Sequence, residues 1–217
     1  WDYVRTFGPI RTLLLVLAFI SLMGFSWSVL LPVFAGQVLH GGANTLGWLS
    51  AASGIGAFIS ALSLVVRKSV VGLTRMLQVA AALLGTTLIL FGLSHWLWLS
   101  LALMVFVGFG MIQSVSVSNT LIQLLVAEDK RARVMSYYTM AFFGSAPFGS
   151  LLAGAMADRI GAPHTVMLTG VFCLACSLWL ALELPKLNAA MVPIYREKGL
   201  LPGYDIDLTA QEPASAA

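Results

Sequence analysis

Residues 108–125, GFGMIQSVSVSNTLIQLL, carry five hydrogen-bonding side chains within an otherwise apolar stretch: Gln113, Ser116, Asn119, Thr120 and Gln123. At about 100° per residue of an α-helix, these side chains fall within an arc of roughly 120°. Amide and hydroxyl groups that face lipid are costly, because hydrocarbon offers them no partner. The stripe therefore predicts either one wall of a polar cavity or hydrogen bonds between helices without any ligand.

Ionisable side chains avoid the apolar runs of the sequence. No Asp, Glu, Lys, Arg or His lies deep within one, and His40, His95 and His164 fall at their ends. An intramembrane protease needs a Ser–His pair or two Asp residues within the bilayer, so we do not expect an enzyme. The C-x-x-C at 173–176 has no further ligand near it, and we interpret it as two small packed residues. We expect no cofactor and no metal.

The composition indicates an integral membrane protein. Of the 217 residues, 59% are hydrophobic and only 10% are charged, whereas a soluble domain has about 25% charged residues. The net charge of +3 does not indicate a nucleic-acid partner, because the basic residues lie in short clusters between apolar runs. Such clusters report membrane topology instead.

Six stretches reach the roughly 20 apolar residues that cross a bilayer as a helix. Their apolarity is continuous rather than alternating, which argues against β-strands. We therefore predict an all-α membrane protein with a cytoplasmic linker at 1–12, a six-helix bundle at 13–184 and a mobile cytoplasmic tail at 185–217. The expected spans are 13–34, 46–66, 76–93, 97–126, 134–157 and 165–184.

Basic residues are concentrated in alternate connections between these spans. Arg159 is the one Lys or Arg on the second side, and the first side carries all the others. The positive-inside rule then predicts that both termini are cytoplasmic. We expect the protein to lie in the inner membrane of the cell. The residues on the first side are Arg5, Arg11, Arg67, Lys68, Arg75, Lys130, Arg131, Arg133, Lys186, Arg196 and Lys198.

The six spans form two similar sets of three. The first and fourth are polar or small on one face, the second and fifth carry small residues four apart, and the third and sixth are mostly Leu, Ala, Val and Phe. Because three is odd, the second set enters the membrane from the opposite side. We therefore predict a 3+3 inverted repeat, an arrangement found in secondary transporters.

The small residues of the second and fifth spans form ladders that let helices approach closely in lipid. We expect them either to pack inside this bundle or to slide against a missing partner half. Their members are Ser53, Ala57 and Ala61 in the second span, and Ser145, Gly149, Ala153 and Ala157 in the fifth.

A polar face on the first span matches the stripe on the fourth. We predict that the two faces line one substrate cavity, formed by Ser21, Phe25, Ser28, Gln113, Ser116, Asn119 and Thr120. Gln123 could instead reach the cytoplasmic headgroups. A cavity wall without ionisable groups suits an amphipathic or lipophilic small molecule better than a small ion.

These features resemble the C-terminal half of a major facilitator superfamily transporter over residues 1–186. The stretch 119–162 is similar to the bacterial branch that includes the enterobactin exporter, in which a loop rich in Arg precedes a P-x-G-x-x-x-A-G helix. The matching positions are Arg131, Arg133, Val134, Met135, Pro147, Gly149, Ala153 and Gly154.

The resemblance implies that the spans are helices 7 to 12 of a twelve-helix exporter that works by alternating access. Helices 7 and 10 would line the cavity, helices 8 and 11 would contact the other half, and helices 9 and 12 would lie outside. The proton coupling is likewise implied by the resemblance, and the missing half would have to supply its acidic group.

The superfamily's cytoplasmic loop motif, G-x-x-A-D-R-x-G, is matched by residues 154–161. Charge counting places that match outside the cell, so we interpret it as a helix end with Asp158 and Arg159 at the interface. The expected loop, residues 67–75, has no Asp. That loop is either a gating relay or a positive-inside anchor, and we favour the anchor.

Two further interpretations of the function stay open. The chain begins with Trp1, and we expect a fragment whose N-terminal half is missing. A homodimer of two six-helix halves would also enclose a cavity. A half-size scaffold or remnant that does not transport is the alternative from another class of protein, whereas a channel is disfavoured because no filter-like loop or charged ring is present.

Overall fold

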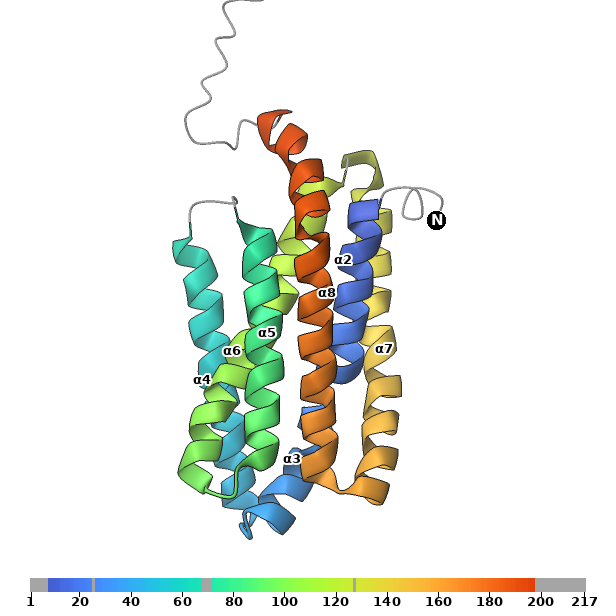
Figure 1. Cartoon of the computed structure of the whole chain (residues 1–217). Coiled ribbons are helices and arrows are strands. Elements are labelled where there is room, and N and C mark those ends of the chain that lie inside the picture. Colours follow the sequence, from blue (N-terminus) through green and yellow to red (C-terminus); the bar gives the residue numbers. More distant parts are fainter. Residues whose placement is uncertain (1–7, 25, 68–71, 127, 198–217) are drawn as a thin grey trace, which may run out of the picture.

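The computed structural model describes residues 8–24, 26–67, 72–126 and 128–197. Within these residues all regular structure is helical, and six helical spans are long and apolar enough to cross a membrane. The prediction of an all-α protein with six spans is confirmed (Figure 1). The elements are α2 Gly8–Phe19, η1 Ile20–Gly24, α3 Trp27–Val33, η2 Phe34–Val38, α4 Ala43–Val66, α5 Leu73–Leu93, α6 Leu97–Leu125, η3 Glu128–Lys130, α7 Arg131–Ile160 and α8 Ala162–Glu197.

Short connections join neighbouring helices. Ser94 caps the turn between α5 and α6, because its hydroxyl lies 2.9 Å from that of Ser100 and both side chains are buried. Gly161 alone separates α7 from α8 and has a φ of 84°, and Gly72 before α5 has a φ of 82°. Both positions use a left-handed backbone, which glycine adopts without steric cost.

The last helix is longer than the sequence predicts. We expected a mobile tail from residue 185 onward, whereas α8 continues through Pro185 to Glu197. An ion pair of 2.8 Å between Lys186 and Glu183 joins successive turns at this point, and the Leu, Ala and Met residues that follow favour a helix. Residues 198–217 lie outside the described residues.

The first span is irregular along its length. Two π-helical segments, η1 and η2, interrupt it, and Ser26 forms a turn before α3 begins. The Ser26 hydroxyl donates to the carbonyl of Leu22 at 2.8 Å. Wide turns of this kind redirect backbone carbonyls and occur frequently at functional sites.

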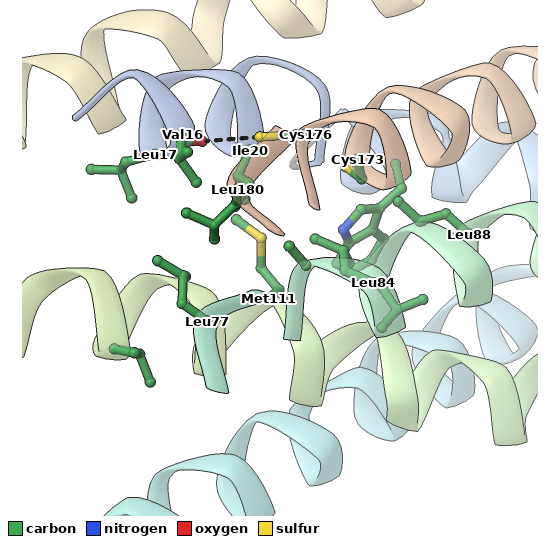
Figure 2. Close-up of a cluster of buried hydrophobic side chains, with 14 of the residues drawn as sticks. Val16, Leu17, Ile20, Leu77, Leu84, Leu88, Met111, Cys173, Cys176 and Leu180 are labelled. Atoms are coloured by element: carbon green, nitrogen blue, oxygen red, sulfur yellow. Dashed lines mark hydrogen bonds between the residues drawn. The ribbon is translucent and has the colours of Figure 1, made fainter. Parts of the chain in front are cut away.

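The hydrophobic core lies where α2, α5, α6 and α8 meet. Figure 2 shows these helices contributing neighbouring side chains, including Leu17 from α2, Leu84 from α5, Met111 from α6 and Leu180 from α8. Three of these four side chains are fully buried. The helices α4 and α7 flank this core on its two sides (Figure 1).

The contacts between spans repeat in a regular way. The second span packs on the fourth, and the fifth packs on the first. The third packs on the fourth, the sixth on the first, and the third and sixth on each other. Interchanging the two sets of three spans leaves these pairs unchanged, as expected for an inverted repeat.

Glycines permit the closest of these contacts. A Cβ added at Gly56 in α4 would lie 1.8 Å from the carbonyl oxygen of Val105 in α6, and one at Gly149 in α7 would lie 1.8 Å from that of Leu22 in η1. Gly85 in α5 and Gly170 in α8 face each other in the same way, because a Cβ added at either would lie 2.7 Å from the other's carbonyl oxygen. At these crossings backbone packs directly on backbone, as in other membrane helix pairs.

The two ends of the bundle differ in chemistry. One end of the bundle carries the described basic residues except Arg159. It is formed by the start of α2, the end of α4, η3, the starts of α5 and α7, and the last part of α8 (Figure 1). The other end carries exposed tryptophans, Trp48, Trp96 and Trp98. Tryptophan is favoured at membrane interfaces, so these side chains mark where the spans leave the hydrocarbon.

We predict that Gly56→Val destabilises the bundle, whereas Gly54→Val does not. The added side chain at position 56 would collide with the α6 backbone, and we expect a cost of about 3 kcal/mol, at the upper end for overpacking. The melting temperature in detergent should fall by roughly 6–12 °C. Gly54 lies on the same helix with no other atom within 4 Å of an added Cβ. Equal melting temperatures for the two variants would contradict the α4–α6 crossing.

Candidate functional site

Gln113 lies inside the bundle, between α6 and α4. Its side chain is 2% exposed, and its Oε1 accepts hydrogen bonds from Ser60 at 2.6 Å and from Ser63 at 3.4 Å. Its Nε2 is buried without a partner among the described residues. The Gln113 oxygen thus joins α6 to α4, which is the second of the two interpretations of the stripe. The cavity role of Gln113 stays a prediction.

The rest of the stripe lies nearer the basic end of α6 and is more open. Ser116 and Asn119 are half-buried, while Thr120 and Gln123 are exposed. The Gln123 amide donates to Asn119 Oδ1, and the Thr120 hydroxyl donates to the Ser116 carbonyl at 3.0 Å on its own helix. The Gln123 amide and the Thr120 hydroxyl thus each donate one local hydrogen bond, and both side chains face outward from the six-helix bundle.

Tyr138 of α7 joins this open polar face, although sequence reasoning did not include it. Its hydroxyl donates to the carbonyl of Val115 at 3.0 Å and also interacts with the Asn119 side chain. The signal in the sequence was a tyrosine one turn after the basic start of the fifth span. Ser114 and Ser118 of α6 were also missed, and both are fully buried.

The first span uses its predicted polar residues differently. Ser21 is buried, and its hydroxyl donates to the carbonyl of Phe142 in α7 at 2.5 Å. Ser28 is half-buried, and Phe25 lies outside the described residues. The structure therefore directs Ser21 toward α7 rather than toward the α6 stripe.

The predicted ladder on α4 lies one residue after the small residues that pack against α6. Ala52, Gly56 and Ser60 are buried against α6, also four residues apart. Of the predicted members, Ser53 and Ala57 are half-buried and Ala61 is exposed. The predicted ladder thus borders the packed face, and the small residues beyond it look away from this bundle.

The ladder on α7 coincides with the face that packs. Gly149 and Ala153 are buried, and Ser145 and Ala157 are half-buried. The Ser145 hydroxyl donates to the Ala141 carbonyl at 2.6 Å and approaches the Ala18 carbonyl of α2 at 3.4 Å. This ladder therefore seats α7 on the first span, as the first of the two predicted roles requires.

The opposite faces of α4 and α7 are uncovered. In their most apolar windows only 22% and 11% of the residues are buried, against 44–56% in the other four spans. Large apolar side chains stand out from these faces, among them Phe58 and Val65 on α4 and Phe148 and Leu151 on α7, each at least 70% exposed. Lipid or another protein segment must cover both faces in a membrane.

The predicted loop charges gather at one end of the bundle. Arg67 lies at the end of α4, where its Nη1 approaches Met76 Sδ at 3.1 Å, and Arg75 is exposed in the first turn of α5. Arg131 approaches Glu128 at 3.8 Å, and Arg133 is exposed. Lys68 lies outside the described residues.

The match to the loop motif at 154–161 is a helix end, as the sequence predicts. The helix α7 ends at Ile160, and the Gly161 N–H donates to the Ala157 carbonyl at 2.9 Å. Asp158 and Arg159 are both exposed, and neither takes part in the two ion pairs formed within the described part of the chain.

The cysteines of the C-x-x-C are buried side by side in the core. Both are free thiols, and Cys176 Sγ lies 4.0 Å from the Val16 carbonyl oxygen of α2 (Figure 2). Among the described residues no three His, Cys, Asp or Glu side chains gather in a way that could hold a metal ion. The packing of both thiols in the core agrees with their interpretation as small packed residues.

We predict an energetic coupling between Ser60 and Gln113. A double-mutant cycle of Ser60→Ala and Gln113→Leu, followed by unfolding in mixed micelles, should give a coupling of about 0.6–1.7 kcal/mol, the range for hydrogen bonds between membrane helices. Pairing Ser60→Ala with Ser114→Ala is the control, because the Ser114 hydroxyl donates to its own helix at Gly110. A coupling no larger than the control would show that Gln113 is available to a solute instead.

Comparison with known proteins agrees with this architecture. Residues 1–208 match the model of the family described as "Transmembrane secretion effector". An uncharacterised MFS-type transporter of Bacillus subtilis (strain 168), YfmI, is 25% identical over 183 residues, which cover 82% of this chain and 45% of that relative. The chain thus spans less than half the length of this relative, and no solved structure gives a significant match. On the family match and the six spans, the chain belongs to the transmembrane secretion effector family of major facilitator superfamily transporters.

Proposed function

We propose that this chain is one half of a secondary transporter that exports amphipathic small molecules by alternating access. The observation that carries the proposal is the open polar face on α6, where Asn119, Thr120 and Gln123 lie within a membrane span and face out of the bundle. Polar side chains at such a position need a partner other than hydrocarbon. A solute in a cavity provides one.

The surroundings of this face suggest the class of solute. Among the described residues of the spans, ionisable groups such as Arg11 and Asp158 lie toward the two ends of the bundle rather than near the midplane. Hydroxyl and amide groups can bind the polar part of a solute, and apolar side chains around them can contact its apolar part. An amphipathic molecule satisfies both kinds of group.

The direction of transport is supported by the family description, and the assignment of the coupling to a second half by the absence of acidic groups deep in the described spans. The family description names secretion, which supports export. No acidic side chain of the described spans lies deep enough to carry a proton, so the proposal assigns coupling to a second half. The narrower resemblance to the enterobactin exporter branch stays a prediction.

The bare faces of α4 and α7 support the existence of a second half. These two helices are the least buried of the six, and the relative from Bacillus subtilis is more than twice as long as the matched stretch. A second half of the same polypeptide is the partner we propose. A second copy of this chain would cover the same faces, and a scaffold that does not transport would leave them to lipid.

We predict that Thr120→Val lowers transport in the native protein that contains this chain. The substitution keeps the side-chain volume and removes a hydroxyl whose bond is internal to its helix, so folding should be unaffected. Losing one hydrogen bond to a solute should reduce transport efficiency roughly two- to tenfold. Uptake of a panel of lipophilic dyes into everted vesicles measures this loss.

Thr139→Val supplies the control for this experiment. Thr139 is exposed on α7, and its hydroxyl likewise donates to its own helix, at Met135, over 3.0 Å. We expect its transport to equal that of the unmodified protein. If no dye is transported by the unmodified protein in either direction, the exporter proposal fails, and the scaffold becomes the better interpretation.

A second prediction tests the missing half. Gly54 and Gly154 lie on α4 and α7 with no other atom within 4 Å of an added Cβ. We therefore expect Gly54→Val and Gly154→Val to leave the melting temperature of this chain alone unchanged. In the native protein, where a partner would cover these faces, the same substitutions should lower transport or assembly at least severalfold. Full transport by both variants would mean that lipid covers the two faces.

A further inference from the structure

A hollow between α2 and α7 is not explained by the proposed cavity. It has a volume of about 250 Å³ and is lined mainly by apolar side chains, with Leu14 and Ala18 on α2 and Met140 and Ala141 on α7. It begins at Arg11, the first residue of the first membrane span, where the basic end of the bundle lies. From Arg11 to Ala18 the hollow follows α2 for about 10 Å.

The hollow ends where hydrogen bonds join the two helices directly. The Ser145 hydroxyl approaches the Ala18 carbonyl at 3.4 Å, and the Ser21 hydroxyl donates to the Phe142 carbonyl at 2.5 Å. The space is therefore limited toward the membrane centre and accessible from the side, where Leu15 and Met140 are 43% and 71% exposed. An occupant would enter laterally and lie along the helices.

The charge at the mouth of the hollow selects the occupant. Arg11 lines the hollow and is exposed, and it forms no ion pair within the described part of the chain. Arg133 is exposed one turn from the start of α7 at the same end. Guanidinium groups at a membrane interface bind phosphate groups, and the Tyr137 ring beside them suits the headgroup level.

The shape of the hollow suits a lipid chain, because it follows α2 for about 10 Å, opens to the side and is lined mainly by apolar side chains. A hydrocarbon chain fits, and with its head at Arg11 its tail would point toward the membrane centre, as lipid tails already do. A second hollow of about 540 Å³, between α2 and α8, is lined by Phe19, Phe172 and Trp179 and has no charged side chain in its lining.

From this geometry we infer that the α2–α7 hollow binds an anionic phospholipid from the leaflet at the basic end of the bundle. The phosphate binds Arg11, and one acyl chain lies against Leu14, Ala18, Met140 and Ala141. The inference goes beyond transport and does not depend on it. It predicts a lipid that packs against both α2 and α7 at the basic end of the bundle.

The test is a lipid titration of the native protein that contains this chain. The delipidated protein is titrated with phosphatidylglycerol or phosphatidylcholine of the same acyl chains, and bound lipids are counted by native mass spectrometry. We expect one site that prefers phosphatidylglycerol by about fivefold or more, as expected for one guanidinium at a membrane surface. Arg11→Gln should abolish the preference, whereas Arg159→Gln, which removes the same charge at the opposite end, should keep it.

A second pair of variants separates the hollow from the charge. Met140→Trp should fill the hollow and remove the bound lipid of either type, whereas Leu178→Trp, an exposed position on α8 outside the hollow, should not. Equal affinities for the two lipids, or equal effects of the two arginine substitutions, would overturn the inference. Cross-linking from position 140 to another protein segment instead of to lipid would do so as well, because a partner would then cover the hollow.

Discussion

The whole arrangement depends on helix backbones touching at glycines. In water a leucine-rich face would drive helices together by leaving solvent, but lipid is as apolar as leucine, so association needs close packing instead. Gly56 and Gly149 admit a carbonyl from the neighbouring span where any Cβ would collide, and Gly85 and Gly170 do this reciprocally. The Leu-rich core fills the space between the helices, but the glycine contacts determine where the helices cross.

The polar side chains form two groups: some form hydrogen bonds across helix contacts, and others lie on the open face of α6. Ser21 and Ser60 donate across helix contacts because a hydroxyl without a partner in hydrocarbon is costly. Gln113 belongs to this group, whereas Asn119 and Thr120 do not cross to α4. One stripe in the sequence thus contains two classes of residue, and only the position of the neighbouring helix separates them.

The sequence predicts the six spans well but the direction in which single residues face less well. Apolar length alone locates all six helices, because no other feature competes with it. The α4 ladder shows the limit: Ala52–Gly56–Ser60 and Ser53–Ala57–Ala61 have the same spacing, so periodicity cannot tell the packed set from its neighbour. Tyr138 was missed because its role depends on its contact with α6. The end of the last helix was placed too early, at 185, because the change in composition there does not end α8, which continues through Pro185.

The distribution of contacts also indicates how the six-helix bundle can move. The reciprocal glycine crossing of α5 and α8 joins the third and sixth spans, and so fastens the two sets of three to each other. The flanking helices α4 and α7 are each fastened to the same core by one glycine face. Shifting either would separate a backbone contact that has no alternative position nearby, so the six spans should move as one body. Under the proposed alternating access, the sliding surfaces are then the bare outer faces of α4 and α7, where side chains rather than backbones would meet a partner.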